Sequence, residues 1–376
     1  MSTEAVANTV RESNATRTPL RISGRSNWLS AGRPVRAGQS LSLRNDAGVV
    51  SYVPGDLTLT VRAGTPLSEI ESVTREHDQW LPLDPYGSND GTIGATIATA
   101  SAGPLATHFG LPRDLVLGLE LVNGRGDVVR AGGKVVKNVA GFDLSRLLTG
   151  SWGTLGVITE VTLRLYARPK LDRSVVVRLK GSERESTAFL RALLGVPLNS
   201  YSLELLGVSA AQALGLGTSR VCLIRFGGNA AAVDAQLREL SSLAKSEEVD
   251  TPVWDRLRNL EKDAGAIVRI SGLPSTFREV SASMLSDEFP WMFEYINPVR
   301  GVLRLVIHDS GDAASDEESV LGLDPTLPNQ PMVFEKLPAE AWAEIPSAVS
   351  DSLSQGIKKA FDPNNVLNPG ILGDLT

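Results

Sequence analysis

Cysteine is nearly absent from this chain of 376 residues, in which Cys222 is the only one. A single cysteine excludes an internal disulfide bond and any iron–sulfur cluster or zinc site held by cysteines. Because Cys222 lies within the strand-like sequence RVCLIRF, we expect a buried structural thiol rather than a reactive one. Histidine is almost as scarce, with His77, His108 and His308 far apart in the sequence, so no metal site is predicted.

Long apolar segments and basic clusters are missing as well. No stretch approaches about 18 uninterrupted apolar residues, so the sequence predicts no transmembrane helix. Residues 1–18 lack the apolar core of a secretory signal, and their polar composition predicts a disordered tail. The net charge is −6 and the basic residues are scattered, which excludes nucleic acid and membrane surfaces as expected partners. We therefore expect a cytoplasmic protein without direct membrane insertion.

Small and hydroxylated residues are concentrated between Asp84 and Gly103, in the sequence DPYGSNDGTIGATIATASAG. A segment with so little apolar bulk has almost nothing to bury, so it is not an ordinary core element. Its glycines let main-chain N–H groups approach a ligand closely, and such loops often bind phosphate groups. The spacing matches neither the Rossmann nor the P-loop pattern of glycines. The segment therefore predicts a cofactor-binding loop of another kind.

Residues 19–170 alternate short strands with short helices. Residues 57–63 and 157–167 alternate apolar and polar side chains, as strands do. Residues 66–76 and 143–148 are predicted helices, because each segment begins with a residue that favours a helix N-terminus. This alternation predicts a mixed domain built from short elements.

The rest of the chain also alternates strands and helices, which predicts a second α/β layer with helices on one face. Arg269 and Arg304 lie on predicted strands, where we expect them on a solvated face. The predicted strands are Ser174–Leu179, Tyr201–Leu206, Val221–Phe226, Ala266–Ile270 and Val302–Ile307. The predicted helices are Glu183–Leu194, Ala230–Glu247, Thr276–Leu285 and Ala339–Ser354, the last interrupted at Pro346.

Several segments together resemble one family of flavoproteins, typified by p-cresol methylhydroxylase (PCMH) and vanillyl-alcohol oxidase. Asp84-Pro85 followed by Thr92-Ile93-Gly94-Ala95 is similar to that family's second phosphate-contacting loop, with alanine in place of a second glycine. Within the family, the sequence from Gly132 to Ile158 is most similar to the FAD-binding subunit of bacterial glycolate oxidases. The other matching segments, which follow in the family's order, are residues 21–27, 53–65, 137–158 and 361–370.

The resemblance implies an α+β protein in several parts. Residues 19–170 would form a two-part FAD-binding domain of the PCMH type. Residues 171–350 would form an α/β cap domain with an antiparallel sheet that closes over the flavin. Residues 351–376 would then return to the first domain.

The resemblance also implies where FAD is bound. Main-chain amides around Gly91–Ala95 and nearby hydroxyls are expected to bind the pyrophosphate and the polar edge of the flavin. Arg25 either adds a positive charge there or is a solvated surface arginine. Relatives with histidyl-bound FAD carry that histidine in the first loop, which has none here, so non-covalent FAD is expected. Ser151 is a further candidate for a flavin contact. The predicted cofactor-binding residues are Gly24, Arg25, Ser26, Asn27, Pro85, Ser88, Gly91, Thr92, Gly94, Ala95, Thr99, Gly153, Gly156, Val157, Ile158 and Asn368.

The implied activity is that of an FAD-binding subunit in a glycolate oxidase complex, which converts the 2-hydroxy acid glycolate to glyoxylate. The implied partners are a homologous flavoprotein that oxidises the hydroxy acid and an iron–sulfur subunit that passes electrons toward a membrane acceptor. Through these partners the subunit would lie at the periphery of the inner membrane. No catalytic residue is predicted, since His308 is expected to be an ordinary strand-end residue.

Two alternatives stay open at the level of the sequence. In the first, the chain is a stand-alone FAD-dependent oxidase or dehydrogenase of another alcohol or hydroxy acid. In the second, it is a non-catalytic scaffold subunit. Ala95 and Arg25, which depart from the family pattern, support the scaffold alternative.

Overall fold

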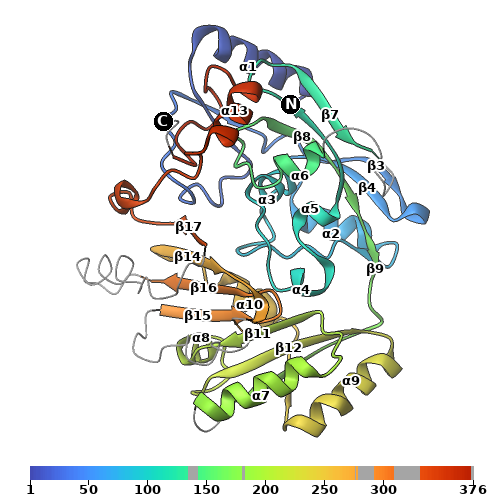
Figure 1. The fold of residues 1–376 in the computed structure, drawn as a ribbon. Coiled ribbons are helices and arrows are strands. Elements are labelled where there is room, and N and C mark those ends of the chain that lie inside the picture. The colour runs from blue at the N-terminus through green and yellow to red at the C-terminus, as the bar shows by residue number, and fades with distance from the viewer. Residues whose placement is uncertain (134–142, 180–182, 276, 278–291, 309–330, 374–376) are drawn as a thin grey trace. The chain divides into compact units, whose positions relative to one another are not determined.

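The computed structural model describes residues 1–133, 143–179, 183–275, 277, 292–308 and 331–373, and Figure 1 shows its fold. The chain forms two compact units. The first unit contains residues 1–102, 110–168 and 339–376, and the second unit contains residues 103–109 and 169–338. The chain therefore leaves the first unit two residues before the predicted boundary and returns to it at residue 339, earlier than the predicted residue 351.

The first unit contains a five-stranded antiparallel sheet in the order β3-β4-β8-β6-β7 and a separate parallel pair, β1-β2. A short antiparallel pair, β5-β9, forms a further two-stranded sheet. Its strands are β1 Leu20–Ser23, β2 Gln39–Ser42, β3 Val49–Val53, β4 Thr58–Arg62, β5 Gln79–Trp80, β6 Val116–Val122, β7 Val128–Gly132, β8 Val157–Arg164 and β9 Tyr166–Ala167. Its helices are α1 Thr3–Thr16, α2 Leu67–Arg75, α3 Ile93–Thr99, α5 Pro112–Leu115, α6 Leu144–Leu148 and α13 Ser352–Phe361, with short 3₁₀ helices at Pro54–Asp56 and Ala341–Glu344.

The prediction of a disordered N-terminal tail is wrong, because residues 3–16 form helix α1. Ser2 caps this helix by accepting a hydrogen bond from the amide of Ala5. Val6, Ala7 and Val10 are fully buried. Their spacing places them on one face of the helix, and α1 packs that face against β6. The polar composition concealed a short apolar stripe that suffices for packing.

The core of the first unit follows from the alternation of its strands. Leu59 and Val61 of β4 are fully buried opposite Leu163 and Val161 of β8, which are their register partners. On the other face of the same strands, Thr60 and Thr162 share a hydrogen bond. Helix α3 packs against β8, and its Ile93 and Ile97 belong to the same buried cluster. The apolar face of the sheet therefore fixes the position of α3.

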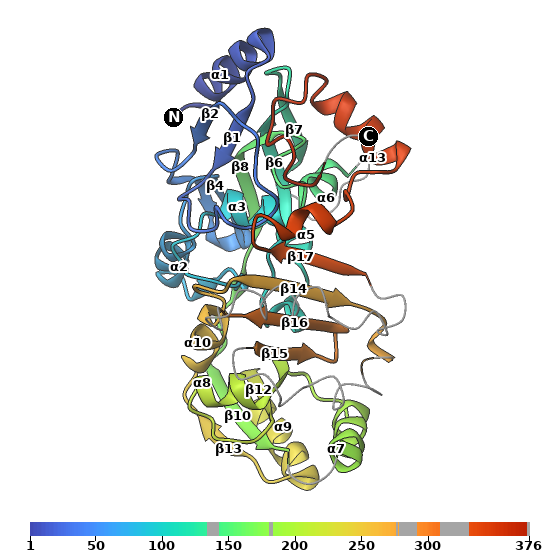
Figure 2. The ribbon, with the colours of Figure 1, turned by 90° about the vertical axis from the view of Figure 1, so that its left-hand side faces the viewer.

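The second unit contains an eight-stranded antiparallel sheet in the order β13-β10-β12-β11-β15-β16-β14-β17. Figure 2 shows β17, β14, β16 and β15 side by side in this unit. The predicted α+β class with an antiparallel sheet is thus confirmed. Its strands are β10 Leu171–Arg178, β11 Ser202–Leu206, β12 Val221–Gly228, β13 Glu247–Val249, β14 Ala266–Ser271, β15 Met292–Asn297, β16 Val302–Ile307 and β17 Met332–Lys336. Its helices are α4 Ala106–Phe109, α7 Glu183–Gly195, α8 Val208–Ala213, α9 Ala230–Leu243 and α10 Val253–Asn259.

Of two helices predicted in the C-terminal half, one is contradicted by the structure and the other lies almost entirely outside the described residues. The predicted helix Ala339–Ser354 is wrong: a 3₁₀ turn spans Ala341–Glu344, and α13 begins only at Ser352. Asp351 sets that start, because its carboxylate accepts hydrogen bonds from the amides of Leu353 and Ser354. The predicted helix Thr276–Leu285 lies outside the described residues except for Phe277. Among the described residues, no helix has the length and apolarity needed to span a bilayer.

A largely buried ionic network lies on β14, β16 and β17. It contradicts the prediction of a solvated face for Arg304, which is buried, whereas Arg269 is partly exposed. Arg304 donates to Glu261 and to Glu335, with Nη2–Oε distances of 2.6 and 2.8 Å. Arg269 Nε lies 2.8 Å from Glu335 Oε1, and Tyr295 donates to Glu261. Burial raises the pKa of Glu261, whereas the two guanidinium groups hold the pKa of Glu335 below its usual range against the effect of burial. The carboxylates therefore have opposite preferences for the proton.

We predict that Glu335→Gln destabilises the protein at neutral pH by about 3–5 kcal/mol, because it removes the carboxylate that compensates two arginines. Glu261→Gln should cost less, because burial raises the pKa of Glu261 and so makes its charged form less favourable in the folded protein than in the unfolded chain. The lowered pKa of Glu335 supplies stability above its unfolded pKa that is lost as the pH falls through its folded pKa. Urea unfolding of both variants between neutral and acidic pH measures this; a larger loss for Glu261→Gln would contradict it.

Candidate functional site

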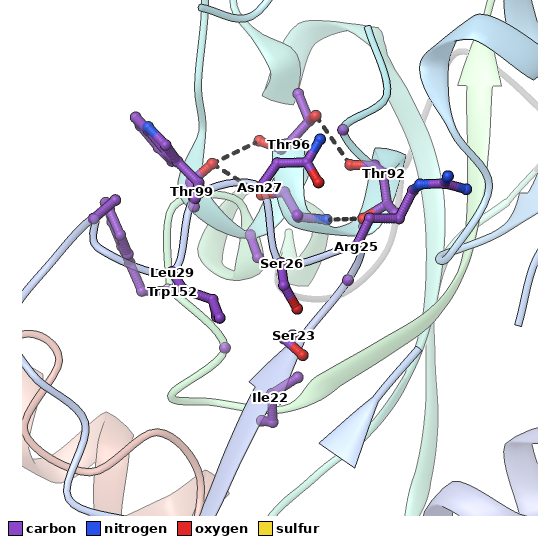
Figure 3. Close-up of a pocket in the computed structure, with 18 of the residues that line it drawn as sticks. Ile22, Ser23, Arg25, Ser26, Asn27, Leu29, Thr92, Thr96, Thr99 and Trp152 are labelled. Atoms are coloured by element: carbon purple, nitrogen blue, oxygen red, sulfur yellow. Dashed lines mark hydrogen bonds between the residues drawn. The ribbon is translucent and has the colours of Figure 1, made fainter. Parts of the chain in front are cut away.

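A cavity of about 190 Å³ lies within the first unit, and three loops and the C-terminal segment line it (Figure 3). Residues 21–23 of β1 and the first loop, residues 24–29, form one part of the lining. The loop and helix α3 of residues 85–101 form the second, and the turn of residues 152–156 with Ile158 forms the third. The structure thus brings together segments that are far apart in the sequence. Of the sixteen predicted cofactor-binding residues, the lining includes Gly24, Arg25, Ser26, Asn27, Pro85, Ser88, Gly91, Thr92, Gly94, Ala95, Thr99, Gly153, Gly156, Ile158 and Asn368.

Val157 and Ser151 are the predicted residues that the structure places elsewhere. Val157 is fully buried in the core of the sheet, because successive side chains of β8 point to opposite faces. Ser151 instead lines a second cavity, between α6 and the C-terminal segment. Residues 134–142, most of which belong to the resembling segment 137–158, lie outside the described residues.

Two glycines allow the main chain to pack closely around the cavity. A Cβ atom at Gly24 would lie 2.3 Å from Thr92 Oγ1, and one at Gly94 would lie 2.7 Å from the Cβ of Ala63. At the same place the amide of Gly94 donates to the carbonyl oxygen of Ala63, over 2.8 Å. The N-terminus of α3 is therefore held against both the first loop and the end of β4.

The amides at the start of α3 already have acceptors within the protein, contrary to expectation. The amides of Gly91, Ile93 and Gly94 donate to main-chain oxygens of Ser88, Thr65 and Ala63, and the amide of Ala95 donates to Thr92 Oγ1. Ser88 is also a poor phosphate ligand, because its exposed hydroxyl lies beside the carboxylate of Asp90. A phosphate group at this helix terminus would have to displace these bonds.

The unpaired donors lie in the first loop instead. Among the described residues, no protein acceptor pairs with the amides of Gly24, Arg25, Ser26 and Asn27. Ser26 has a left-handed backbone with φ of 67°, and consecutive amides around such a residue form a concave anion-binding nest. The guanidinium group of Arg25 has no carboxylate partner within the described residues. The lining contains arginines but no aspartate or glutamate, so this end of the cavity favours an anion.

The hydroxyl groups along α3 present the opposite hydrogen-bonding character. Thr96 and Thr99 donate their protons to the carbonyl oxygens of Thr92 and Ala95, over 3.0 and 2.9 Å. Figure 3 shows Thr92, Thr96 and Thr99 along one side of the helix. Since the protons of Thr96 and Thr99 are committed, their oxygens face a ligand as acceptors. The cavity therefore pairs an anion-binding loop with a wall suited to hydroxyl and N–H donors.

Two tryptophans of the lining were missed by the sequence prediction. Trp28 and Trp152 stack with ring centroids 6.0 Å apart and planes 18° apart. Trp28 directly follows the predicted residue Asn27 of the first loop. Trp152 lies between the predicted residues Ser151 and Gly153. A bulky aromatic residue within or beside a run of glycines and serines is the signal that could have identified them.

The cysteine and histidines outside the cavity, all of them described residues, do not form a catalytic group. Cys222 is fully buried and free, and burial raises the pKa of its thiol, which confirms the prediction of a structural residue. His308 lies at the end of β16, where its Nε2 is 2.9 Å from the carbonyl oxygen of Leu260. Burial lowers the pKa of His108, which packs against Phe109 and Tyr201. Within the described residues, no histidine lines the cavity.

Comparison with known proteins agrees with this geometry. Residues 1–132 match the FAD binding domain family. The chain is 42% identical over 174 residues to glycolate oxidase subunit GlcE of Escherichia coli (strain K12), an alignment covering 46% of this chain and 49% of that protein. It is 26% identical over 378 residues to glycolate oxidase subunit GlcD of Bacillus subtilis (strain 168), covering 90% of this chain and 80% of that protein.

The fold is that of a PCMH-type flavoprotein. The structure of p-cresol methylhydroxylase with substrate bound superposes with a TM-score of 0.72 at 16% identity, over 100% of this chain and 88% of that one. The superposition shows the fold that the motifs predict. The match of residues 1–132 to an FAD binding domain and the similarity to GlcE support FAD as the cofactor. The alignment with GlcE spans only about half of that protein's length.

We predict that Gly94→Ala lowers the affinity for FAD at least about tenfold, because the added methyl group forces α3 away from Ala63. Gly91→Ala is the matched control in the same loop: its Cβ would meet only the carbonyl oxygen of Ser88, at 3.4 Å. Titration of the apoprotein with FAD, followed by flavin fluorescence, measures both variants. Equal affinities would show that the close contact at Gly94 does not shape the site.

Proposed function

From its FAD-binding domain and the cavity that this domain contains, we propose that the chain is the FAD-binding subunit of a glycolate oxidase type of complex. The complex oxidises glycolate, or a closely related 2-hydroxy acid, to the corresponding 2-oxo acid. Its other members are a homologous flavoprotein that oxidises the hydroxy acid and an iron–sulfur subunit that takes the electrons onward. The similarity to glycolate oxidase subunits GlcE and GlcD supports this assignment.

The observation that carries the proposal is the division of the cavity into a donor end and an acceptor wall. The free amides of residues 24–27 and the guanidinium group of Arg25 suit the diphosphate of FAD. The oxygens of Thr96 and Thr99 suit the ribityl hydroxyls and the flavin N–H group. When bound, FAD would supply a redox group that takes up electrons and passes them on.

The cavity lining supports non-covalent binding of FAD. Among the described residues that line it, none is histidine or cysteine, and Tyr86 is the one phenol. Acid precipitation of the holoprotein should therefore release the flavin into the supernatant. Flavin that stays with the precipitate would contradict this, and its release in Tyr86→Phe would then identify the attachment.

The lining also favours a division of labour between subunits. Oxidation of a hydroxyl group needs a base for the hydroxyl proton, in addition to a hydride acceptor. The described lining of the cavity contains no histidine, aspartate or glutamate for that role. We therefore assign the chemistry on the hydroxy acid to the homologous partner and the relay of electrons to this chain.

An absorption spectrum of the chain purified alone, before and after anaerobic addition of glycolate, tests the proposal. A flavin spectrum that stays oxidised until the partner flavoprotein is added supports a relay subunit. Bleaching by glycolate without a partner would instead identify a stand-alone dehydrogenase. A colourless protein that binds no added FAD but copurifies with its partners would identify a scaffold subunit.

We predict that Arg25→Ala weakens the binding of FAD by about 10- to 100-fold, which corresponds to the loss of a hydrogen bond to a charged group. The binding of riboflavin, which lacks phosphate, should change little. Arg44→Ala, at an exposed residue outside the lining, is the control. Isothermal titration at two salt concentrations measures the effect, and an equal loss for riboflavin would contradict a phosphate contact.

A further inference from the structure

The turn at Trp152 and Gly153 forms one wall of the cavity in an unusual conformation. Both residues have left-handed backbones, with φ of 54° and 69°. For tryptophan this conformation is strained and persists only where surrounding contacts hold it. The ring of Trp152 stacks on Trp28 and lies against Gly32, where a Cβ atom would be 3.0 Å from the ring. The turn therefore also positions the first loop.

Two donors from the C-terminal segment hold this turn from either side. Nδ2 of Asn368 donates to the carbonyl oxygen of Trp152, and Nζ of Lys358 donates to the carbonyl oxygen of Thr154, each over 2.8 Å. We refer to Asn368 and Lys358 as the C-terminal clamp. Asn368 is 4% exposed and Lys358 is 6% exposed, so water competes little for either bond.

Asn368 also fixes the opposite wall of the cavity. Its side-chain Oδ1 accepts a hydrogen bond from the main-chain amide of Ile22 over 2.7 Å. Its main-chain amide donates to the carbonyl oxygen of Leu20. Leu20 and Ile22 belong to β1, which leads directly into the first loop. A single side chain thus joins β1 to the turn at Trp152, and a Cβ at Gly153 would lie 2.8 Å from its Nδ2.

Lys358 anchors the clamp to the rest of the C-terminal segment. Its remaining donors bind Oδ2 of Asp362, over 2.6 Å, and the carbonyl oxygen of Leu367, over 3.2 Å. The carboxylate of Asp362 in turn accepts hydrogen bonds from the amides of Val366 and Leu367. All three protons of the ammonium group are committed, so Lys358 has no proton left for a ligand.

We propose that Asn368 and Lys358 are positioning residues for the cofactor: they hold the strained turn at Trp152 and Gly153 against the first loop, and so form the cavity. The proposal rests on the proposed binding of FAD. It gives Asn368 a role that differs from a direct contact with one part of the cofactor. If both walls depend on it, the binding of both halves of FAD depends on it too.

Asn368→Asp tests this with minimal change of shape. The carboxylate keeps an acceptor for the amide of Ile22 but replaces the donor to Trp152 with an oxygen that the carbonyl group repels. We expect the affinities for FAD, for FMN and for ADP each to fall at least tenfold, by isothermal titration. A loss confined to FMN or to ADP would identify a direct ligand of that half, and unchanged affinities would show that the clamp is dispensable. Either result overturns the proposal.

Asn364→Asp is the matched control, because Asn364 belongs to the same loop but bonds to Asn14 of α1 instead of the cavity. It should leave all three affinities within about twofold of the parent protein. If Asn368→Asp does not fold by circular dichroism, Asn368→Gly replaces it, because glycine suits the left-handed backbone at this position, where φ is 44°.

A readout on the apoprotein separates this proposal from the binding of FAD. The stacked rings of Trp28 and Trp152 should give an exciton signal in circular dichroism, identified by its loss in Trp28→Phe. Asn368→Asp should diminish that signal without any cofactor present. A parent protein that binds no FAD would refute the proposed function, whereas an unchanged exciton signal in Asn368→Asp would refute the clamp.

Discussion

Close contact between main-chain segments at Gly24 and Gly94 is the constraint on which the rest of the site depends. With no side chain at either position, the first loop touches Thr92 and the start of α3 touches Ala63. The unpaired amides of the first loop and the hydroxyls of α3 can therefore face one cavity from opposite sides. A methyl group at either glycine would separate these walls before it met any ligand.

The sequence was sufficient to find the cavity but not to assign the chemistry within it. The order of the glycine-rich segments placed fifteen of the sixteen predicted residues around one cavity. Which amides are free, however, depends on neighbours far along the chain. Those of Ile93 and Gly94 are paired because Thr65 and Ala63 lie beside them, and only the fold brings these residues together. The anion-binding role that we propose therefore falls to residues 24–27 instead of 91–95.

The errors in the predicted fold have similar causes. Helix α1 was missed because three buried residues, Val6, Ala7 and Val10, are enough to dock it on β6 although its other residues are polar. Arg304 was assigned to a solvated face because the sequence does not show that Glu261 and Glu335 lie on either side of it. In both cases the prediction followed from the local composition, whereas a few long-range contacts determine whether the residues are buried.

Strand β1 bridges to Leu367, and the side chain of Asn368 reaches Ile22 across 346 residues of sequence. During synthesis, β1 leaves the ribosome on the order of tens of seconds before these partners do. Residues 169–338 can form their own core in that interval, because their sheet uses strands from that range alone. We therefore expect the unit that contains the cavity to close last, and loading of the flavin to be a late step that coincides with completion of the fold. A nascent chain that has not yet docked its C-terminal segment would present an open first loop without a cofactor.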